Sequence, residues 1–209
     1  MTDLKADWDA YASSTNSVII QAYYYFSVWR SYFLLLRGLP ISSGTMLEIG
    51  ASTGQNSLRL SKKYQLQPTL VDTSPLALKL AQQRFALTDF SPILVNENVL
   101  SLSLPETYDV VHSHGLLEHF RDPEQTLAFN NHAKHVREGG WLICWVPTPD
   151  IPYRLNRWYL ETTHQWIFGY ERPLTVTEFA RFFHQEQLHI RKIRHFPGWL
   201  GIAAQRPIS

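Results

Sequence analysis

Hydrophobic and polar positions alternate in blocks along the middle of the chain. Short apolar runs, each typical of a buried strand, cover residues 46–49, 68–72, 92–96, 108–114 and 141–146. Between them, apolar residues recur at helical spacing over 55–64, over 74–85, and from Asp122-Pro123 up to Gly139-Gly140, where the glycines are expected to end the helix. Strands that alternate with helices in this way predict a parallel sheet with right-handed crossovers.

The C-terminal part has a different pattern. Residues 173–183 predict a helix that Thr175 or Thr177 caps. Residues 188–196 alternate apolar and basic side chains, and residues 198–205 follow a Pro-Gly turn, so the two form a predicted hairpin. The sequence therefore predicts an α/β fold with a doubly wound, mostly parallel seven-stranded sheet and an antiparallel C-terminal strand.

The N-terminal segment is rich in aromatic residues. Residues 18–36 approach the ~20 residues that a membrane helix needs. However, the segment contains Gln21 and Arg30, and an arginine in a spanning helix costs at least ~2.5 kcal/mol. We therefore expect no stable membrane insertion. Residues 1–40 are interpreted as a helical lid that packs on the domain formed by residues 41–209 and covers a substrate.

Composition limits the function further. The chain has 209 residues, of which 44% are hydrophobic, and a formal net charge of +1. Such a chain suits one domain, and it has no strong overall field to attract nucleic acid. One cysteine excludes an internal disulfide framework, and the N-terminus has no apolar core of a signal peptide. A cytoplasmic protein with a small-molecule substrate is expected, and its oligomeric state stays open, a homodimer included.

Candidate chemistry begins at "MLEIGASTGQNSLRL", residues 46–60. A strand that turns into a helix through glycines lets the backbone approach a ligand, and the helix N-terminus supplies free N–H groups. Asp72 ends the next strand, where an acid can bind ribose hydroxyls. A dinucleotide fingerprint would need glycines at 50, 52 and 55, but the chain has Gly50, Ser52 and Gln55. A nucleotide-dependent oxidoreductase is therefore the weaker alternative.

Four segments together resemble Class I S-adenosylmethionine-dependent methyltransferases. "LEIGASTGQ" is similar to their motif I, in which Glu48, Gly50 and Gly54 match and Ser52 replaces a glycine. "LVDTSPLAL" resembles the following strand, and "VREGGWLICWVPTP" resembles motif III. "ENVLSLSLPETYDVVHSHGLLEHFRDPEQ" is similar to the ubiquinone and menaquinone methyltransferase type, the type 11 branch. The resemblance implies a Rossmann-like fold, S-adenosyl-L-methionine as cofactor and S-adenosyl-L-homocysteine as product.

The resemblance also implies a set of cofactor-binding residues. These are Glu48, Gly50, Ala51, Gly54, Gln55, Asp72, Thr73, Ser74, Asn98, Val99 and Ser113. Glu48 would order the loop, Asp72 would bind the ribose hydroxyls, and the Ser113 carbonyl would take the methionine ammonium. Each residue also has a structural interpretation. Asp72 or Ser74 could cap the following helix, and Asn98 could form an Asx turn.

Methyl transfer needs a base only if the acceptor must lose a proton. His114, Glu118 and His119 follow the fourth strand and are the candidate catalytic residues, with a loop-holding role as the alternative. Glu118-His119 also resembles the acidic cluster with which some ubiquinone-type O-methyltransferases bind magnesium. No zinc-type spacing is present, and His132 and His135 are expected on a solvated helix face, so no metal is predicted.

The acceptor site should combine the lid, the loop after the fourth strand, and a substrate-side insertion at 147–173. The candidate contacts are Tyr11, Tyr24, Trp29, His164 and Tyr170. No basic extension suits RNA. The sequence thus predicts methyl transfer to an oxygen, nitrogen or carbon atom of a small molecule, mainly by alignment and desolvation. A catalytically inactive S-adenosylmethionine-binding subunit is the alternative.

Overall fold

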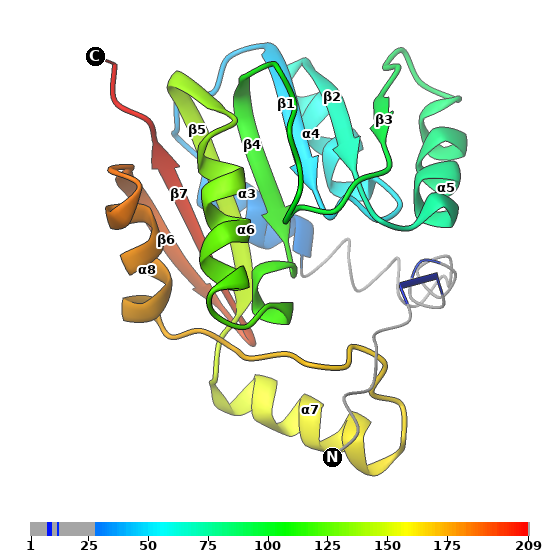
Figure 1. Ribbon diagram of the computed structural model, residues 1–209, viewed down its shortest axis with the longest axis vertical. Coiled ribbons are helices and arrows are strands. Elements are labelled where there is room, and N and C mark those ends of the chain that lie inside the picture. Colours follow the sequence, from blue (N-terminus) through cyan, green and yellow to red (C-terminus); the bar gives the residue numbers. More distant parts are fainter. Residues whose placement is uncertain (1–7, 10–11, 13–27, 209) are drawn as a thin grey trace.

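The computed structural model describes residues 8, 9, 12 and 28–208 of the chain (Figure 1). The first half contains α3 (Arg30–Leu36), β1 (Gly44–Ile49), α4 (Gln55–Tyr64), β2 (Leu66–Val71), α5 (Pro75–Phe85), β3 (Ile93–Val95) and β4 (Tyr108–His114). The second half contains the 3-10 turn η2 (Leu117–His119), α6 (Glu124–Ala133), β5 (Val136–Pro147), α7 (Ile151–Thr162), α8 (Val176–Gln185), β6 (His189–Phe196) and β7 (Trp199–Gln205).

The strands form one seven-stranded sheet in the order β3-β2-β1-β4-β5-β7-β6. Strands β1 to β5 pair in parallel, whereas β7 runs antiparallel to both β5 and β6. This topology confirms the predicted doubly wound sheet with an antiparallel last strand. The carboxyl ends of β1, β2 and β4 meet at one edge, which is where ligands bind in sheets of this kind.

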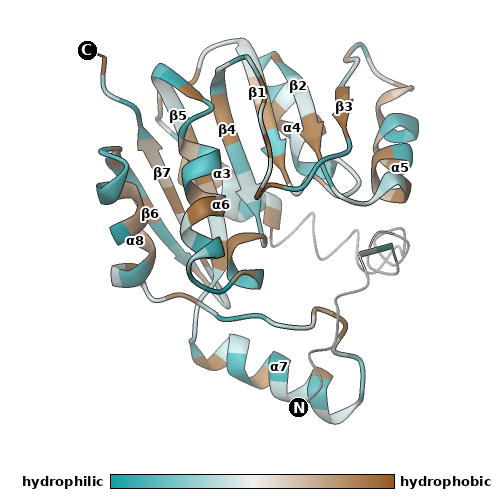
Figure 2. Cartoon of the chain, viewed as in Figure 1, coloured by the Kyte–Doolittle hydropathy of each residue, from teal (hydrophilic) through white to brown (hydrophobic). Residues whose placement is uncertain are grey.

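Helices cover both faces of the sheet (Figure 1). On one face, α6 and α8 contribute Phe129, Phe179 and Phe183 to the largest core cluster. On the other face, Tyr32 of α3 and Leu60 of α4 belong to a second cluster with several strand residues. Hydrophobic colouring follows the central strands, as expected for a sheet that is buried on both sides (Figure 2). The two clusters hold the strand ends that shape the site.

Local sequence signals set two helix starts. Ser74 caps α5, because its Oγ accepts a hydrogen bond from Ala77 N at 3.0 Å, and Pro75 takes the first helical position. Thr175, and not Thr177, caps α8, and Glu178 completes a reciprocal capping box. Both starts are as the sequence predicts.

The helix after β4 is shorter than predicted. α6 ends at Ala133 and β5 already begins at Val136, so Gly139 and Gly140 lie inside the strand. The register against β4 shifts there, which marks a bulge. Gly139 has φ +71°, and a Cβ on Gly140 would lie 2.9 Å from the Arg137 carbonyl oxygen. The paired glycines therefore allow a crowded bulge and do not stop a helix.

The prediction that His132 and His135 occupy a solvated face is wrong. Both side chains are buried, and each Nδ1 contacts the carbonyl oxygen four residues earlier, at 2.7 Å and 2.6 Å. This contact satisfies one ring nitrogen inside the helix, so the imidazoles can pack between α6 and its surroundings. Burial lowers the pKa of His132 to about 4.

Most of the predicted lid, including Tyr11 and Tyr24, lies outside the described residues. Within the predicted N-terminal segment, the structure describes α3, which packs on the sheet through buried Tyr32, Leu35 and Leu36. Within the described ranges, no helix has both the length and the hydrophobicity that crossing a bilayer requires.

Candidate active site

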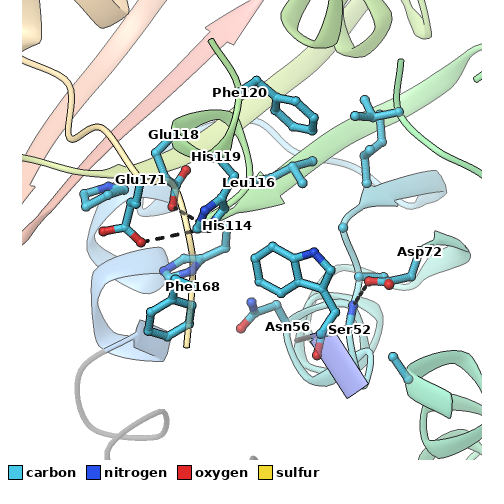
Figure 3. A pocket seen from close by; sticks show the side chains of 18 of the residues that line it. Ser52, Asn56, Asp72, His114, Leu116, Glu118, His119, Phe120, Phe168 and Glu171 are labelled. Atoms are coloured by element: carbon cyan, nitrogen blue, oxygen red, sulfur yellow. Dashed lines mark hydrogen bonds and ion pairs between the residues drawn. The ribbon is translucent and has the colours of Figure 1, made fainter. Parts of the chain in front are cut away.

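A cavity of about 990 Å³ opens at the carboxyl ends of β1, β2 and β4. One side is formed by the loop after β1, by Asp72 and by residues 97–99, and the other by η2, α7 and the segment after α7. Figure 3 shows the two sides, with Ser52 and Asp72 on one and Glu118, His119 and Glu171 on the other. We call these the strand-end side and the α7 side.

The loop after β1 turns sharply to start α4. Gly50, Ser52 and Gly54 all have left-handed φ values of 71°, 47° and 66°. A Cβ on Gly54 would lie 3.0 Å from Leu70 and 3.1 Å from Phe85, so this glycine allows α5 to pack closely. Gly54 does not line the cavity, whereas Gly50, Ala51 and Gln55 do. The first residues of the loop, Gly50 and Ala51, therefore face a ligand in the cavity, and Gly54 does not.

Glu48 fixes this loop from below. Its Oε2 accepts hydrogen bonds from the Ser57 hydroxyl at 2.6 Å and from Ser57 N at 3.3 Å. His112 Nδ1 lies 3.7 Å from Glu48 Oε1, and Tyr32 Oη lies 3.3 Å from the same nitrogen. Burial raises the pKa of Glu48 to about 8 and lowers that of His112 to about 3. Glu48 therefore joins β1, α4 and β4 beneath the cavity that it also lines.

Asp72 connects two loops. Its Oδ2 accepts a hydrogen bond from Ser52 N at 2.7 Å, and its Oδ1 accepts one from Ser74 N at 2.9 Å. Burial raises the pKa of Asp72, although these hydrogen bonds oppose the shift. Each carboxylate oxygen keeps a lone pair for a ligand hydroxyl. The structure thus gives Asp72 a local role and leaves acceptor capacity toward the cavity.

The remaining strand-end candidates differ in position. Thr73, Asn98 and Val99 line the cavity, and Asn98 Oδ1 also accepts a hydrogen bond from Leu100 N at 2.9 Å, which forms an Asx turn. Ser74 caps α5, contacts Asp9, and does not line the cavity. Ser113 is fully buried in β4 and does not line it either.

Two buried polar atoms on the strand-end side have no hydrogen-bond partner in the part of the chain that the structure describes. They are Ser52 Oγ and Asn56 Oδ1, and both residues line the cavity. A buried polar group without a partner costs about 1–3 kcal/mol, so a polar ligand that bonds to them would recover part of that cost. Together with Asp72, these atoms suit a ligand that carries hydroxyl and amino groups.

His114 lies at the boundary between the two sides. Its ring stacks on Tyr32 with centroids 5.9 Å apart and contacts Trp199 at 4.3 Å. Burial lowers the pKa of His114 to about 3, so the ring is neutral at pH 7. This placement makes His114 a weak base that shapes the cavity wall.

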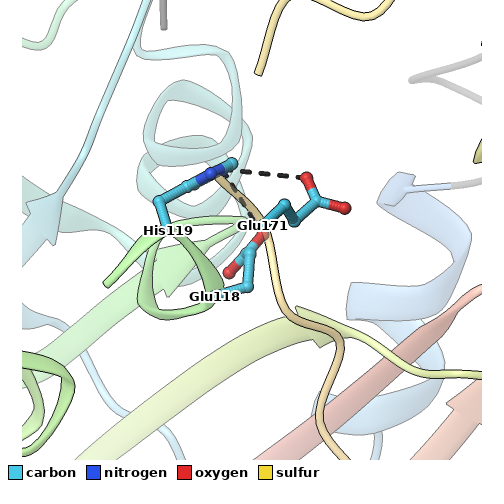
Figure 4. A group of neighbouring side chains, drawn as sticks. All are labelled: Glu118, His119 and Glu171. Carbon is cyan, nitrogen blue, oxygen red and sulfur yellow. Dashed lines mark ion pairs between the residues drawn. The ribbon is translucent and has the colours of Figure 1, made fainter. Parts of the chain in front are cut away.

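Glu118, His119 and Glu171 converge on the α7 side (Figure 4). His119 Nε2 lies 3.8 Å from Glu118 Oε1 and 3.9 Å from Glu171 Oε2. His119 Nδ1 lies 3.0 Å from the Tyr170 carbonyl oxygen, and this contact requires Nδ1 to carry the proton. Burial raises the pKa of both glutamates and lowers that of His119 to about 4. His119 is therefore neutral at pH 7, with the lone pair of Nε2 toward the carboxyl groups.

The predicted acceptor contacts are only partly brought together. Tyr170 lines the cavity, whereas Trp29 packs beside the core cluster of α3, and exposed His164 does not line the cavity. Arg157 and Arg172 form ion pairs with Glu161 and Glu178, at 2.8 Å and 2.7 Å, and neither lines the cavity.

Sequence reasoning did not single out several lining residues, namely Trp8, Asn56, Glu171 and Trp199. Asn56 sits one position beyond Gln55 in the first turn of α4, so its position next to the glycine loop was a usable signal. Glu171 had no such signal, because its partner His119 is remote in sequence and only the tertiary structure joins them.

Comparison with known proteins agrees with this geometry. Residues 46–140 match a family model described as a methyltransferase domain. A chain from the complex of the Haloferax volcanii Trm112 methyltransferase activator with a methyltransferase has a TM-score of 0.74 at 16% identity, over 98% of this chain and 99% of that one. A search of curated proteins finds no match.

Two further solved structures share the fold. The N-methyltransferase NodS from Bradyrhizobium japonicum WM9, in complex with S-adenosyl-L-homocysteine, has a TM-score of 0.65 at 18% identity, over 92% of this chain and 90% of that one. An S-adenosylmethionine-dependent methyltransferase from Clostridium acetobutylicum ATCC 824 has a TM-score of 0.67 at 14% identity, over 96% and 99%. Residues 46–140 thus match a methyltransferase domain, and the described chain shares its fold with solved S-adenosylmethionine-dependent methyltransferases.

Proposed function

We propose that this protein transfers the methyl group of S-adenosylmethionine to a small molecule bound on the α7 side of the cavity. The observation that supports this proposal is the single cavity, which joins the loop after β1 and Asp72 to a wall of aromatic side chains. Its volume of about 990 Å³ is at the upper end of the range for small-molecule sites. There is thus room for a cofactor and a small acceptor side by side.

On the strand-end side, the chain's own groups would hold the cofactor. Asp72 would accept hydrogen bonds from two ribose hydroxyls through the lone pairs that Ser52 N and Ser74 N leave free. Asn98 and Val99 would border the adenine. Asn56 Oδ1 and Ser52 Oγ, which have no partner, would meet polar groups at the amino-acid end. Glu48 would keep the loop in shape from beneath.

On the α7 side, aromatic side chains would position the acceptor. Trp166, Phe168 and Tyr170 line this wall, and Trp166 packs edge-on against Phe168 with centroids 5.1 Å apart. The bound cofactor supplies a methyl group on a positively charged sulfur. The protein's task is then to hold the acceptor atom in line and to exclude water, and a wall of packed aromatic rings suits both.

Calorimetric titration with S-adenosylmethionine, S-adenosylhomocysteine and NAD tests the cofactor. We expect both sulfur compounds to bind and NAD to bind weakly or not at all. Tight NAD binding without S-adenosylhomocysteine binding would overturn the proposal in favour of an oxidoreductase. An inactive binding subunit would bind S-adenosylhomocysteine but transfer no labelled methyl group to any compound in a broad acceptor screen.

Asp72→Ala should weaken S-adenosylhomocysteine binding by roughly 1.5–3 kcal/mol, the usual scale for hydrogen bonds to a charged group. Asp89→Ala removes an exposed carboxylate and is the matched control, with no expected change. The melting temperature of each variant shows whether the fold survives. If Asp72→Ala leaves binding intact and lowers only the melting temperature, Asp72 serves the two loops and not the ribose.

A further inference from the structure

The cluster of Glu118, His119 and Glu171 contains more acceptor atoms than donors. Tyr153 Oη donates a hydrogen bond to Glu171 Oε1 at 2.8 Å, which leaves Glu171 Oε2 facing His119. Glu118 Oε2 has no hydrogen-bond partner among the described residues, and its side chain is only 1% exposed and lines the cavity. Because Nδ1 of His119 holds the proton, its Nε2 is a further acceptor.

Among the described residues, no arginine or lysine forms an ion pair with Glu118 or Glu171. The Arg157 guanidinium donates to Tyr153 Oη at 2.9 Å and to the Glu171 backbone carbonyl at 2.8 Å, and it pairs with Glu161. Among the described residues, it forms no hydrogen bond or ion pair with either carboxyl group of the cluster. A buried charge in such a place needs a cation or a proton.

The spacing of the three acceptors favours an ammonium group over a small metal ion. The three residues each offer one oxygen or nitrogen atom that could bind a cation, and these atoms lie within 4.8 Å of one another. His119 Nε2 lies 3.8 Å from Glu118 Oε1 and 3.9 Å from Glu171 Oε2. Neighbouring ligand atoms lie about 3.0 Å apart around octahedral magnesium and about 3.4 Å apart around tetrahedral zinc. Acceptors that surround an ammonium nitrogen at hydrogen-bond distance lie up to about 4.6 Å apart.

We propose that the acceptor is a primary or secondary amine, and that Glu118 and Glu171 bind its ammonium group and take up its proton. This inference rests on the proposed methyl-transfer function and assigns the substrate class of the same site. An ammonium group brings up to three N–H donors to Glu118, Glu171 Oε2 and His119 Nε2. Carboxylate or phosphate acceptors are disfavoured, because like charges would meet in a buried site.

The proton balance follows from the same groups. The ammonium R–NH3+ gives one proton to the Glu118 carboxylate, which becomes a carboxylic acid, and the amine nitrogen gains a free lone pair. That nitrogen forms the new N–CH3 bond while the C–S bond breaks and its electron pair returns to sulfur. The product is the methylated ammonium, and the Glu118 proton leaves to solvent when the product departs. Burial raises the pKa of Glu118, which makes it a better proton acceptor than an exposed glutamate.

The test uses the full chain, saturated with S-adenosylhomocysteine, and three isosteric probes: phenethylamine, 2-phenylethanol and phenylacetate. Hexylamine and tryptamine extend the amine panel to other sizes. Binding is followed by calorimetry and by the shift in melting temperature, and methyl transfer is followed with labelled S-adenosylmethionine. The variants are Glu118→Gln and Glu171→Gln, which keep the side-chain shape. Glu106→Gln, in an exposed loop, is the matched control.

We expect amines to raise the melting temperature and to accept methyl groups, while the alcohol and the acid do neither. Glu118→Gln and Glu171→Gln should each weaken amine binding at least tenfold and leave S-adenosylhomocysteine affinity within twofold. Glu106→Gln should change neither affinity.

Three results would overturn the assignment. One is that no amine in the panel protects the protein. The second is that amine binding survives both glutamine substitutions. The third is that Mg²⁺, Mn²⁺ or Zn²⁺ alone raises the melting temperature in a way that Glu118→Gln abolishes, which would make the cluster a metal site. Failure of the wild-type protein to bind S-adenosylhomocysteine would instead refute the proposed function itself.

Discussion

The two sides of the cavity are built in different ways. The strand-end side consists of short segments that directly follow β1, β2 and β3, and backbone hydrogen bonds hold it together, such as those from Gly50 N and Ala51 N to the Val71 carbonyl oxygen. The α7 side consists of side chains from η2, α7, the segment after α7 and the turn before β7. One side is fixed by backbone, and the other by side chains that are remote in sequence.

The two sides also treat buried carboxyl groups differently. Glu48 accepts two hydrogen bonds from Ser57, whereas one oxygen of Glu118 has no partner within the described ranges. A satisfied carboxyl group supports a fixed shape, and an unsatisfied one is suited to a ligand. Glu48 therefore supports the shape of the loop after β1, whereas Glu118 keeps an oxygen that a ligand on the α7 side could use.

The largest effect should come from deleting residues 1–30. Trp8 lines the cavity and contacts His119 with ring centroids 4.9 Å apart, so this deletion opens the α7 side to water. Methyl transfer should fall at least about 100-fold, the loss that misplaced reacting groups can cause. S-adenosylhomocysteine affinity should stay within about tenfold, because the strand-end side is intact.

The deletion also removes buried Val28, so size-exclusion chromatography must first show that the truncated protein is monodisperse. Should it be monodisperse and keep full turnover, residues 1–30 do not act as a cover for the acceptor, and the interpretation of a lid is wrong.

A smaller effect is expected where the two sides meet. A Cβ on Gly50 would lie 3.1 Å from Leu116 Cδ1, in the loop that also holds Glu118, whereas a Cβ on Gly38 would meet nothing within 4 Å. Both glycines have left-handed φ values, +71° and +80°. Gly38→Ala should therefore cost about 1 kcal/mol of unfolding free energy, and Gly50→Ala about 2–4 kcal/mol. Urea denaturation measures both.

Gly50→Ala should also weaken the binding of both S-adenosylhomocysteine and the acceptor, because it displaces Leu116. If both alanine variants lose the same unfolding free energy, the loop after β4 moves aside without cost. The contact between Gly50 and Leu116 then does not couple the two sides of the cavity.

The smallest effect concerns pH. Burial raises the pKa of Glu48 to about 8, well above its value in the unfolded chain, so the folded state holds this proton more tightly. The associated stability is present at low pH and is lost as pH rises through about 8. Between pH 7 and pH 9 the loss should be about 1.4 kcal/mol. Urea denaturation at both pH values measures it.

The buried histidines do not obscure this window, since His112 and His114, with pKa values of about 3, are neutral throughout it. Glu48→Gln should show a flatter pH profile than the wild type. If the profile of Glu48→Gln has the same slope as that of the wild type, another group carries the pH dependence and the Glu48 proton is not held in this way.

Local sequence determined much of the fold and of the strand-end side. Apolar runs predicted the strands, Ser74 and Thr175 predicted two helix starts, and the glycine loop predicted the position of the cavity. These signals are local, because hydrophobic periodicity, helix capping and turn formation each involve only a few neighbouring residues. Asp72 was predictable for the same reason, since it directly ends a buried strand.

Tertiary structure decided the rest. Gly139 and Gly140 form a bulge because β4 crowds that point, and His132 is buried because α6 packs that face. Glu171 meets His119 only because the chain returns from α7 past η2. Contacts of this kind depend on how segments that are distant in sequence pack together. A short-range sequence pattern carries no information about that packing. The sequence pattern therefore predicted the strand-end side of the cavity, whereas the α7 side depends on contacts that only the folded chain makes.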